Sequence, residues 1–359
     1  MYNDTLIKKK SDEREKQEMR KGIHILLWIL ALLALALFVL AAVSRLGYHR
    51  SMAATVTEWN LRRTEVRSLY ETKENAEKYM KEMESAKPNA EYEIPVAAKL
   101  TVSQREMMVG ETKVFFLNDT GHNEKAILYI PGGGYINQPT IRHWKFAETL
   151  ALTNNAEVIV AIYPKLPKFT FEKAYEDLEK IIPMITLGFG WDNVTILGDS
   201  SGGGLALGFC EYLSYTGQRQ PGNLILISPW VDATMKNPRI AEYVDTDPML
   251  APEGLKVLAK AWAGKEETKF YKISPINGQM DGLENVTVFS GTREIFYPDE
   301  RILCQKLQSS GVNVRFFIGN GLNHDYPIHN TPEGKNAVQL IMDIIGGKAV
   351  ETEGSSSAA

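Results

Sequence analysis

A serine flanked by glycines stands where a short apolar run gives way to a helical stretch. The run Val194–Leu197 leads into Gly198-Asp-Ser-Ser-Gly202, and helical spacing continues from Leu205 to Tyr215. Glycines permit a sharp strand-to-helix turn, which would lift the Oγ of Ser200 above a sheet and next to the positive end of a helix. A phosphate-binding loop would need lysine after its last glycine, where Leu205 stands instead. The pattern predicts that Ser200 is a nucleophile.

A serine nucleophile needs a general base, and histidine is the most frequent one. On a turn of this kind the chain order is serine, then acid, then histidine, so only His324 and His329 qualify among the six histidines. His324 lies in a glycine-bearing loop after an apolar run that ends at Ile318. His329 lies farther out, beyond Pro327. We predict that His324 is the base and that His329 is a surface residue.

The base in turn needs a carboxylate that orients it, and several carboxylates follow the apolar run Val286–Phe289. Asp299 and Glu300 come directly after a proline and fit the first turn of a helix, where proline and acidic residues are both favoured. Glu294 has no such structural reason in its loop, so we predict that Glu294 is the acid. Asp299 remains the main alternative, and Asp247 is a weaker one.

A second glycine-rich segment, Pro131-Gly-Gly-Gly-Tyr135, directly follows the apolar run Ala126–Ile130. The tetrahedral intermediate of acyl transfer carries an oxyanion, which must be met by preorganised N–H donors. Glycines allow backbone N–H groups to turn toward a substrate, and with the N–H of Ser201 they would complete an oxyanion hole.

Short apolar runs alternate with helical stretches from about residue 90 onward. This alternation is typical of a buried, mostly parallel sheet with helices on both faces, so we predict an α/β fold for residues 90–347. Residues 233–272 interrupt the rhythm with three prolines, and we expect a helical lid there. The expected strands are Val109–Leu117, Ala126–Ile130, Glu157–Ile162, Val194–Leu197, Leu224–Ile227, Val286–Phe289 and Val312–Ile318.

Residues 23–43 form an apolar stretch with one ionisable side chain, His24, at its edge. As a helix, these 21 residues would be about 31 Å long, which is enough to cross the hydrocarbon core of a bilayer. A cleaved secretory signal is the alternative, but its apolar region normally has roughly 7–15 residues, and the cleavage candidate Ala42-Val-Ser44 is poor. The sequence predicts a transmembrane signal anchor over residues 22–43.

The charges that flank this span set its predicted orientation. Seven Lys or Arg residues lie within residues 1–21, and four lie within the twenty residues after the span. Because the more basic flank stays in the cytoplasm, we predict that tail 1–21 is cytoplasmic and that the rest is extracytoplasmic. Residues 44–89 would be a juxtamembrane segment, with one amphipathic helix from Thr55 to Ser85 docked on the catalytic domain. The polar stretch 348–359 would be a flexible tail.

Composition excludes several other classes of protein. A formal net charge of −4 gives no reason to expect nucleic acid as a partner. The two cysteines, Cys210 and Cys304, are too few for a disulfide framework and lack metal-ligand spacing, so we expect buried thiols. The sequence implies neither a metal nor an organic cofactor.

These motifs resemble the hormone-sensitive-lipase-like branch of the α/β hydrolases, the acetyl-esterase and lipase group. The resemblance covers about Ala126 to Ile345 and rests on four segments in the order of that family: Pro131–Tyr135, Gly198–Gly203, Gly291–Glu294 and Leu322–Pro327. It implies the α/β-hydrolase fold with a serine, acid and histidine triad of Ser200, Glu294 and His324. It also implies that the oxyanion hole consists of the N–H groups of Gly133, Gly134 and Ser201.

Two positions depart from the pattern of that family. Pro131 stands where the family usually has histidine, and Glu294 stands where it usually has aspartate. The family histidine is thought to shape the loop rather than to bind the oxyanion, so the resemblance implies an active site with altered loop rigidity. Glutamate is tolerated as the acid of this fold, but its extra methylene changes where the carboxylate can stand.

Together these features predict a membrane-anchored serine esterase or lipase that hydrolyses carboxylic esters through an acyl-serine intermediate. Its substrate would be a small-molecule or lipid ester, and its membrane contact would be made by residues 23–43. Two alternatives remain open. One is an amidase or peptidase with the same triad, and the other is a catalytically inactive hydrolase fold that binds partners at the cell surface.

Overall fold

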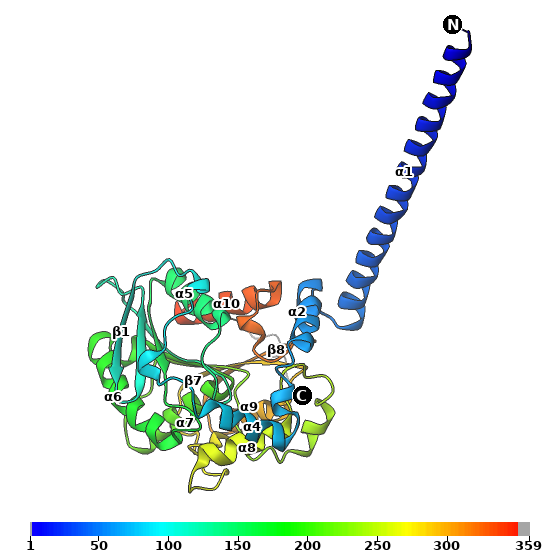
Figure 1. Cartoon of the computed structure of the whole chain (residues 1–359). Coiled ribbons are helices and arrows are strands. Elements are labelled where there is room, and N and C mark those ends of the chain that lie inside the picture. Colours follow the sequence, from blue (N-terminus) through cyan, green and yellow to red (C-terminus); the bar gives the residue numbers. More distant parts are fainter. Residues whose placement is uncertain (1, 351–359) are drawn as a thin grey trace, which may run out of the picture.

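The computed structural model describes residues 2–350, and an eight-stranded sheet lies at the centre of the domain (Figure 1). The strand order is β1-β2-β4-β3-β5-β6-β7-β8. β2 is antiparallel to both β1 and β4, and the other neighbours are parallel, which confirms the predicted α/β class. The strands are β1 (Gln104–Val109), β2 (Thr112–Leu117), β3 (Ala126–Ile130), β4 (Glu157–Ile162), β5 (Val194–Asp199), β6 (Asn223–Ile227), β7 (Asn285–Gly291) and β8 (Asn313–Gly319).

The stretch Val109–Leu117, which the sequence predicted as one strand, contains a reversal of the chain. β1 ends at Val109 and β2 begins at Thr112, so the two strands form a hairpin. Gly110 in the turn has a φ of +60°, a conformation that glycine adopts without strain. A Cβ there would also lie 2.0 Å from Oδ1 of Asp177, so this tight turn requires glycine.

Five helices cover the two faces of the sheet (Figure 1). α5 (Ile141–Asn154) and α10 (Pro332–Ile345) belong to the core of one face, whereas α6 (Phe171–Phe189), α7 (Ser200–Tyr215) and α9 (Tyr297–Ser309) belong to that of the other. Strands β3, β4 and β5 are buried along their whole length, because a strand covered on both faces has no solvent side.

The parallel register brings the ends of several strands to one edge of the sheet. Gly291 at the end of β7 pairs with Gly319 at the end of β8, and Asp199 at the end of β5 pairs with Ile227 at the end of β6. The loops that follow these strands therefore start close together, although they are far apart in sequence. Ligand sites of open α/β sheets form at this carboxyl edge.

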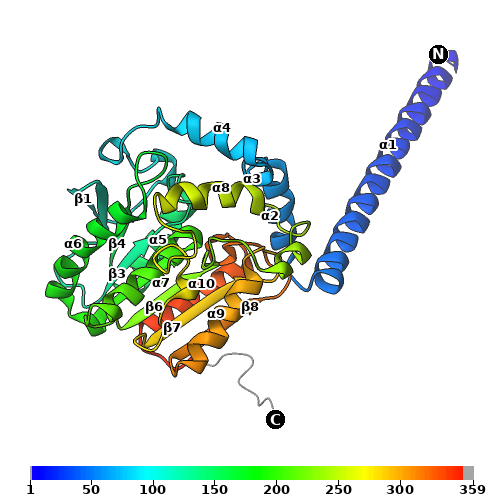
Figure 2. The same cartoon turned by 90° about the horizontal axis from the view of Figure 1, so that it is seen from below.

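The chain begins with a long helix, α1 (Tyr2–Ala42), which projects away from the catalytic fold (Figures 1 and 2). The segment Lys16–Gly47 has a mean hydropathy of 3.0 in its most apolar window, and none of that window is buried. Such a helix is compatible with a membrane anchor or with a signal sequence. The predicted tail 1–21 and span 22–43 thus lie largely in one continuous helix. Of the predicted tail 348–359, residues 351–359 lie outside the described residues.

The single helix predicted from Thr55 to Ser85 is wrong, because the chain breaks it twice. The chain turns at Glu65, which has a φ of +53°, and Thr72 is extended. The hydroxyl of Thr72 accepts a hydrogen bond from the N–H of Asn75, which stabilises a new helix start at this point. The three helices are α2 (Met52–Arg63), α3 (Ser68–Glu71) and α4 (Lys73–Met83).

α3 and α4 pack on α8 (Pro252–Ala263), and together these helices form a cap over the carboxyl edge of the sheet (Figure 2). Gly254 in α8 permits this close approach, because a Cβ there would lie 2.5 Å from the Cα of Tyr70. The lid predicted at residues 233–272 therefore supplies only part of the cover. The juxtamembrane segment supplies the rest.

Candidate active site

Ser200 is the first residue of α7 and has a φ of +52°, which residues other than glycine rarely adopt. Two neighbouring glycines make this turn possible. A Cβ at Gly198 would lie 2.4 Å from the carbonyl oxygen of Gly202, and a Cβ at Gly202 would lie 2.0 Å from that of Ile130. The turn thus has the strained strand-to-helix form that places a nucleophilic serine at the carboxyl edge of a sheet.

The structure brings together the three residues predicted as a triad. His324 Nε2 lies 3.0 Å from the Oγ of Ser200, and His324 Nδ1 lies 2.5 Å from Oε2 of Glu294. All three side chains are buried. In this geometry Nε2 can accept the serine proton while Nδ1–H donates to the carboxylate, as general-base chemistry by histidine requires.

Two further donors hold the carboxylate of Glu294. Its Oε1 accepts hydrogen bonds from the N–H of Gly291 at 2.7 Å and from the hydroxyl of Ser228 at 2.9 Å. The Oγ of Ser228 also accepts from the N–H of Asp325 at 2.9 Å. Ser228 therefore joins the acid loop, residues 292–296, which carries Glu294, to the loop that carries His324. No pattern in the sequence indicates this role.

The two other carboxylates considered for the acid have different partners. Asp299 lies in the first turn of α9 and accepts from the side chain of Asn237 at 2.7 Å. Asp247 accepts from the N–H of Ile295 at 3.0 Å and from two N–H groups within its own loop. Within residues 2–350, neither carboxylate makes a hydrogen bond to His324. Asp247 instead fixes the backbone next to Glu294.

The prediction that His329 lies on the surface is wrong, because only 7% of this residue is exposed. Its Nε2 donates to the carbonyl oxygen of His324 at 3.1 Å, and its Nδ1 lies 3.2 Å from the guanidinium of Arg142. Burial and the charge of Arg142 lower the pKa of His329 to about 4, so the ring stays neutral. His329 thus supports the backbone of the residue predicted as the base.

Acidic neighbours control the charge of His324. Burial opposes protonation, but the carboxylates of Asp325 and Glu294 outweigh it and raise the pKa of His324 above its ordinary value of 6.5. Oδ2 of Asp325 lies 3.3 Å from Nε2 of His324. Burial in turn raises the pKa of the Asp325 carboxyl, which His324 partly opposes.

The glycine-rich segment after β3 faces the same place as Ser200. Gly133 and Gly134 have φ values of +130° and +62°, and both line one cavity with Ser200 and His324. Asp199, the residue before Ser200, holds this loop in place: its Oδ2 accepts a hydrogen bond from the N–H of Gly132 at 3.0 Å. The fold thus places two glycines with positive φ beside Ser200, where backbone N–H donors to an oxyanion are needed.

The cavity over Ser200 has a volume of about 330 Å³ and lies between the sheet edge and the cap. Its walls are mostly apolar and come from the juxtamembrane segment, from α8 and its preceding loop, and from the acid loop. The apolar side chains that line it are Val66, Leu69, Tyr70, Trp230, Met249, Leu250, Leu255 and Phe296. A largely apolar pocket with a few convergent polar groups is typical of a small-molecule site.

A family model described as alpha/beta hydrolase fold matches residues 127–328, which is more than half of the chain. The chain belongs to the α/β-hydrolase family. It is 28% identical over 209 residues to a triacylglycerol lipase of Mycobacterium tuberculosis, a match that covers 58% of this chain and 43% of that lipase. It is 25% identical over 235 residues to an acetyl-hydrolase of Streptomyces hygroscopicus, which covers 65% of this chain and 79% of that protein. The chain is therefore a hydrolase of the esterase and lipase type.

Solved structures agree with this assignment. A Staphylococcus aureus protein provisionally named an esterase superposes with a TM-score of 0.75 at 28% identity, covering 79% of this chain and 97% of that one. A homologue of hormone-sensitive lipase from a metagenome library has the same fold, with a TM-score of 0.66 at 24% identity. That match covers 77% of this chain and 95% of the homologue. The predicted resemblance to the esterases and lipases of the α/β-hydrolase family is confirmed.

This hydrolase has Pro131 where the family usually has histidine. Another histidine, His143, contacts Asp199, the residue that holds the glycine-rich loop. Nε2 of His143 lies 3.3 Å from Oδ2 of Asp199, the oxygen that also binds Gly132. Nδ1 of His143 accepts from the N–H of Thr140 at 3.0 Å, which leaves Nε2–H to donate to the carboxylate. No pattern in the sequence indicates this contact, because His143 lies in α5, outside the family motifs.

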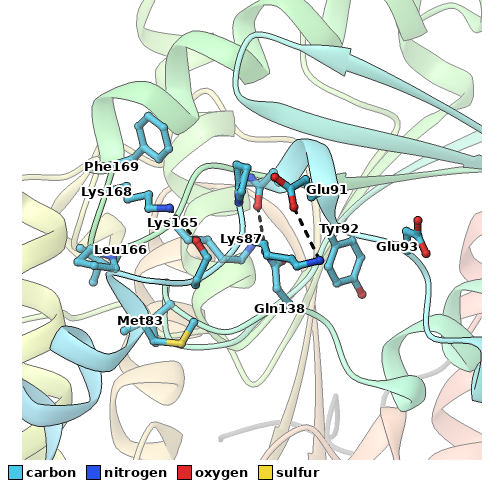
Figure 3. A pocket seen from close by; sticks show the side chains of 15 residues that line it. Met83, Lys87, Glu91, Tyr92, Glu93, Gln138, Lys165, Leu166, Lys168 and Phe169 are labelled. Atoms are coloured by element: carbon cyan, nitrogen blue, oxygen red, sulfur yellow. Dashed lines mark hydrogen bonds and ion pairs between the residues drawn. The ribbon is translucent and has the colours of Figure 1, made fainter.

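A second cavity of the hydrolase, about 310 Å³ in volume, lies beyond the end of α4 (Figure 3). None of the three residues predicted as a triad lines it. Its floor includes the buried Lys165, whose Nζ donates to the carbonyl oxygen of Tyr163 at 3.1 Å. Burial lowers the pKa of Lys165 to about 7. Figure 3 shows the exposed pair Lys87 and Glu91 at the rim of this cavity.

Cys210 and Cys304 are free and buried, as predicted. Burial raises the pKa of both thiols, so neither is a reactive thiolate at neutral pH. Within residues 2–350, no three His, Cys, Asp or Glu residues are grouped so that they could hold a metal ion.

Proposed function

We propose that this hydrolase is a membrane-anchored serine esterase with Ser200 as nucleophile, His324 as base and Glu294 as the orienting acid. The observation that carries this proposal is the continuous chain of hydrogen bonds from Ser200 Oγ through His324 to Glu294, with distances of 3.0 and 2.5 Å. A serine without a base is a poor nucleophile at neutral pH, and this contact would remove its proton during attack.

The reaction follows from that geometry in two halves. Ser200 Oγ attacks the ester carbonyl while His324 Nε2 takes the serine proton, and Glu294 stabilises the imidazolium that forms. The N–H groups of Gly133, Gly134 and Ser201 stabilise the oxyanion of the tetrahedral intermediate. His324 then gives its proton to the leaving alkoxide, and the acyl group remains on Ser200. Water, activated by the same histidine, releases the acid.

The cavity favours esters with short acyl chains. Its volume of about 330 Å³ lies near the lower end of ordinary ligand pockets, about 300–1,000 Å³. Apolar walls would bind an acyl chain, and they would disfavour a charged substrate, because burying an unpaired charge among apolar side chains costs free energy. Uncharged small-molecule or lipid esters are therefore the proposed substrates.

The location of the enzyme rests on α1. Its apolar segment and the excess of basic residues before that segment support a single-pass anchor with a cytoplasmic N-terminus and an extracytoplasmic catalytic domain. The competing interpretation, a secreted protein whose signal sequence is removed, predicts a mature chain that lacks these residues.

Turnover and active-site labelling of the purified full-length protein in detergent test the enzymatic proposal. We expect hydrolysis of p-nitrophenyl acetate, labelling by a fluorophosphonate probe, and loss of both in Ser200→Ala. Faster cleavage of matched anilides or peptides would favour the amidase or peptidase alternative. Absence of labelling and turnover in a folded protein would favour the inactive binding protein. A Ser200→Ala variant that is still labelled would overturn the assignment of the nucleophile.

A further inference from the structure

A buried carboxylate in α2 lies next to the loops of the proposed triad. Glu58 is 4% exposed and is surrounded by three guanidinium groups. It accepts from Arg50 Nη1 at 2.6 Å, from Arg62 Nε at 3.0 Å, and from Nε and Nη2 of Arg293, both at 3.0 Å. The pair with Arg293 is bidentate, which fixes orientation as well as distance.

Arg293 belongs to the loop that carries Glu294, and Arg50 contacts the loop that carries His324. Arg293 directly precedes Glu294 in the acid loop. Arg50 Nη1, which binds Glu58, also donates at 2.8 Å to the carbonyl oxygen of Gly321, three residues before His324. Glu58 is therefore linked to both loops through one guanidinium on each side.

The backbone of Gly321, in the loop that carries His324, also lies against the backbone of Tyr48. Gly321 has a φ of +71°, and a Cβ there would lie 1.9 Å from the carbonyl oxygen of Tyr48. The N–H of Gly321 donates to the hydroxyl of Thr292 at 2.8 Å, which ties the two loops to each other. The chain between α1 and α2 thus covers the point where the loops meet (Figure 1).

We propose that Glu58 is a positioning residue for the triad, and that the juxtamembrane helix is part of the active-site scaffold rather than a spacer. The proposal rests on the proposed function of Ser200, Glu294 and His324. Glu58 shares its single negative charge between Arg293 and Arg50, whose guanidinium groups would otherwise draw water or move toward solvent. Without it, the Arg293 side chain loses its anchor, and the adjoining Glu294 can shift away from His324.

The charge state of Glu58 is consistent with this role. Burial alone would raise the pKa of Glu58, but the hydrogen bonds and charges of Arg293 and Arg50 outweigh it and lower the pKa. The carboxylate is thus ionised at neutral pH and can hold both guanidinium groups. Arg62 adds a contact with the lid, because its Nη2 donates to the carbonyl oxygen of Thr246 at 3.0 Å.

The test compares Glu58→Gln with Glu77→Gln in the full-length protein in detergent. Glu77 lies in α4 of the same segment but is exposed, and within residues 2–350 its ion pair is with the exposed Lys73. Rates are normalised to the fraction of sites that a fluorophosphonate probe titrates, so that unfolded protein does not count. We expect Glu58→Gln to lower kcat about 10- to 100-fold with KM changed less than about threefold, because small displacements of catalytic groups cost rate rather than binding. Glu77→Gln should match the wild type.

Two further measurements separate positioning from simple stability. The acid limb of kcat/KM should move to lower pH in Glu58→Gln, because a loosened Glu294 stabilises the imidazolium of His324 less. Glu58→Asp, which keeps the charge, should recover part of kcat. Arg293→Gln alone should reduce kcat. In the Glu58→Gln background the same substitution should lower kcat by less than a further factor of about two, since both substitutions remove the Arg293–Glu58 pair.

The outcomes are distinct from those that test the enzyme function itself. An unchanged kcat per titrated site and an unchanged acid limb in Glu58→Gln would overturn the positioning role, even if the thermal midpoint fell. Failure of the triad would appear instead as residual turnover in Ser200→Ala.

Discussion

At the scale of single residues, the two oxygens of the Glu294 carboxylate have separate partners. Asp299, the main alternative as the acid of the proposed triad, lies in the first turn of α9 instead. The longer side chain of glutamate lets Oε2 reach His324 while Oε1 binds Gly291 and Ser228. Two oxygens with separate partners fix the carboxylate more firmly than one.

Replacing either carboxylate by its amide distinguishes the candidates. Glu294→Gln should lower kcat on p-nitrophenyl acetate about 10³- to 10⁴-fold, because the amide stabilises the wrong tautomer of His324 and cannot support the imidazolium. Asp299→Asn should keep kcat within about threefold. The opposite ranking of the two variants would assign the acid to Asp299.

The raised pKa of His324 makes a directional prediction for pH. Its imidazole must be neutral to accept a proton, so kcat/KM should fall as pH decreases through a pKa above 6.5. Removing the neighbouring charge in Asp325→Asn should shift this acid limb to lower pH. The measurement is kcat/KM for p-nitrophenyl acetate from pH 5 to 9, corrected for spontaneous hydrolysis. A wild-type limb at or below pH 6.5 would contradict the electrostatic argument.

At the scale of elements, the turn at Ser200 carries a clear local signal, whereas the breaks between α2, α3 and α4 carry a weaker one. The missed turn between β1 and β2 also carried a signal, in Gly110. The turn at Ser200 is marked by glycines at fixed spacing, which the sequence displays directly. The breaks between α2, α3 and α4 are hidden, since their apolar residues keep helical spacing across Glu65 and Thr72. Packing of α3 and α4 on α8 acts together with the cap at Thr72 in placing these bends.

The two-part cap predicts how acyl length is selected. Leu69, from the juxtamembrane segment, lines the cavity over Ser200, so Leu69→Trp should fill part of that volume. We expect the ratio of kcat/KM for p-nitrophenyl octanoate to that for acetate to fall about tenfold, because overpacking a pocket costs about 1–3 kcal/mol. Leu152→Trp, at an exposed position on α5, serves as the matched control. An equal loss on both esters in Leu69→Trp would argue against an acyl role for this wall.

At the scale of the whole molecule, the order of motifs along the chain was enough to identify the triad candidates. Strand order and parallel register then bring Ser200, Glu294 and His324 to one edge, as the fold class implies. The fold class implies no comparable rule for side-chain contacts between segments that are distant in sequence. The bond from Arg293 to Glu58 spans 235 residues, and the support of His324 by His329 depends on how a short turn folds back. Single-sequence patterns do not encode these contacts.

The proposed anchor can be tested by fractionation. The native protein should sediment with membranes, resist extraction at alkaline pH and dissolve in detergent, because an apolar helix of this length partitions into the bilayer. A protease added outside intact cells should cleave the catalytic domain but not the first residues. A soluble mature form that lacks α1 would instead indicate a cleaved signal sequence.

The connection between α1 and α2 consists of residues 43–51. Even fully extended, nine residues reach only about 30 Å, so on the proposed anchoring the pocket stays within a few nanometres of the lipid surface. Enzyme and lipid ester would then meet by lateral diffusion in two dimensions. Turnover of such a substrate should follow its mole fraction in the bilayer rather than its bulk concentration, and diluting it with inert lipid should slow the reaction at constant total amount.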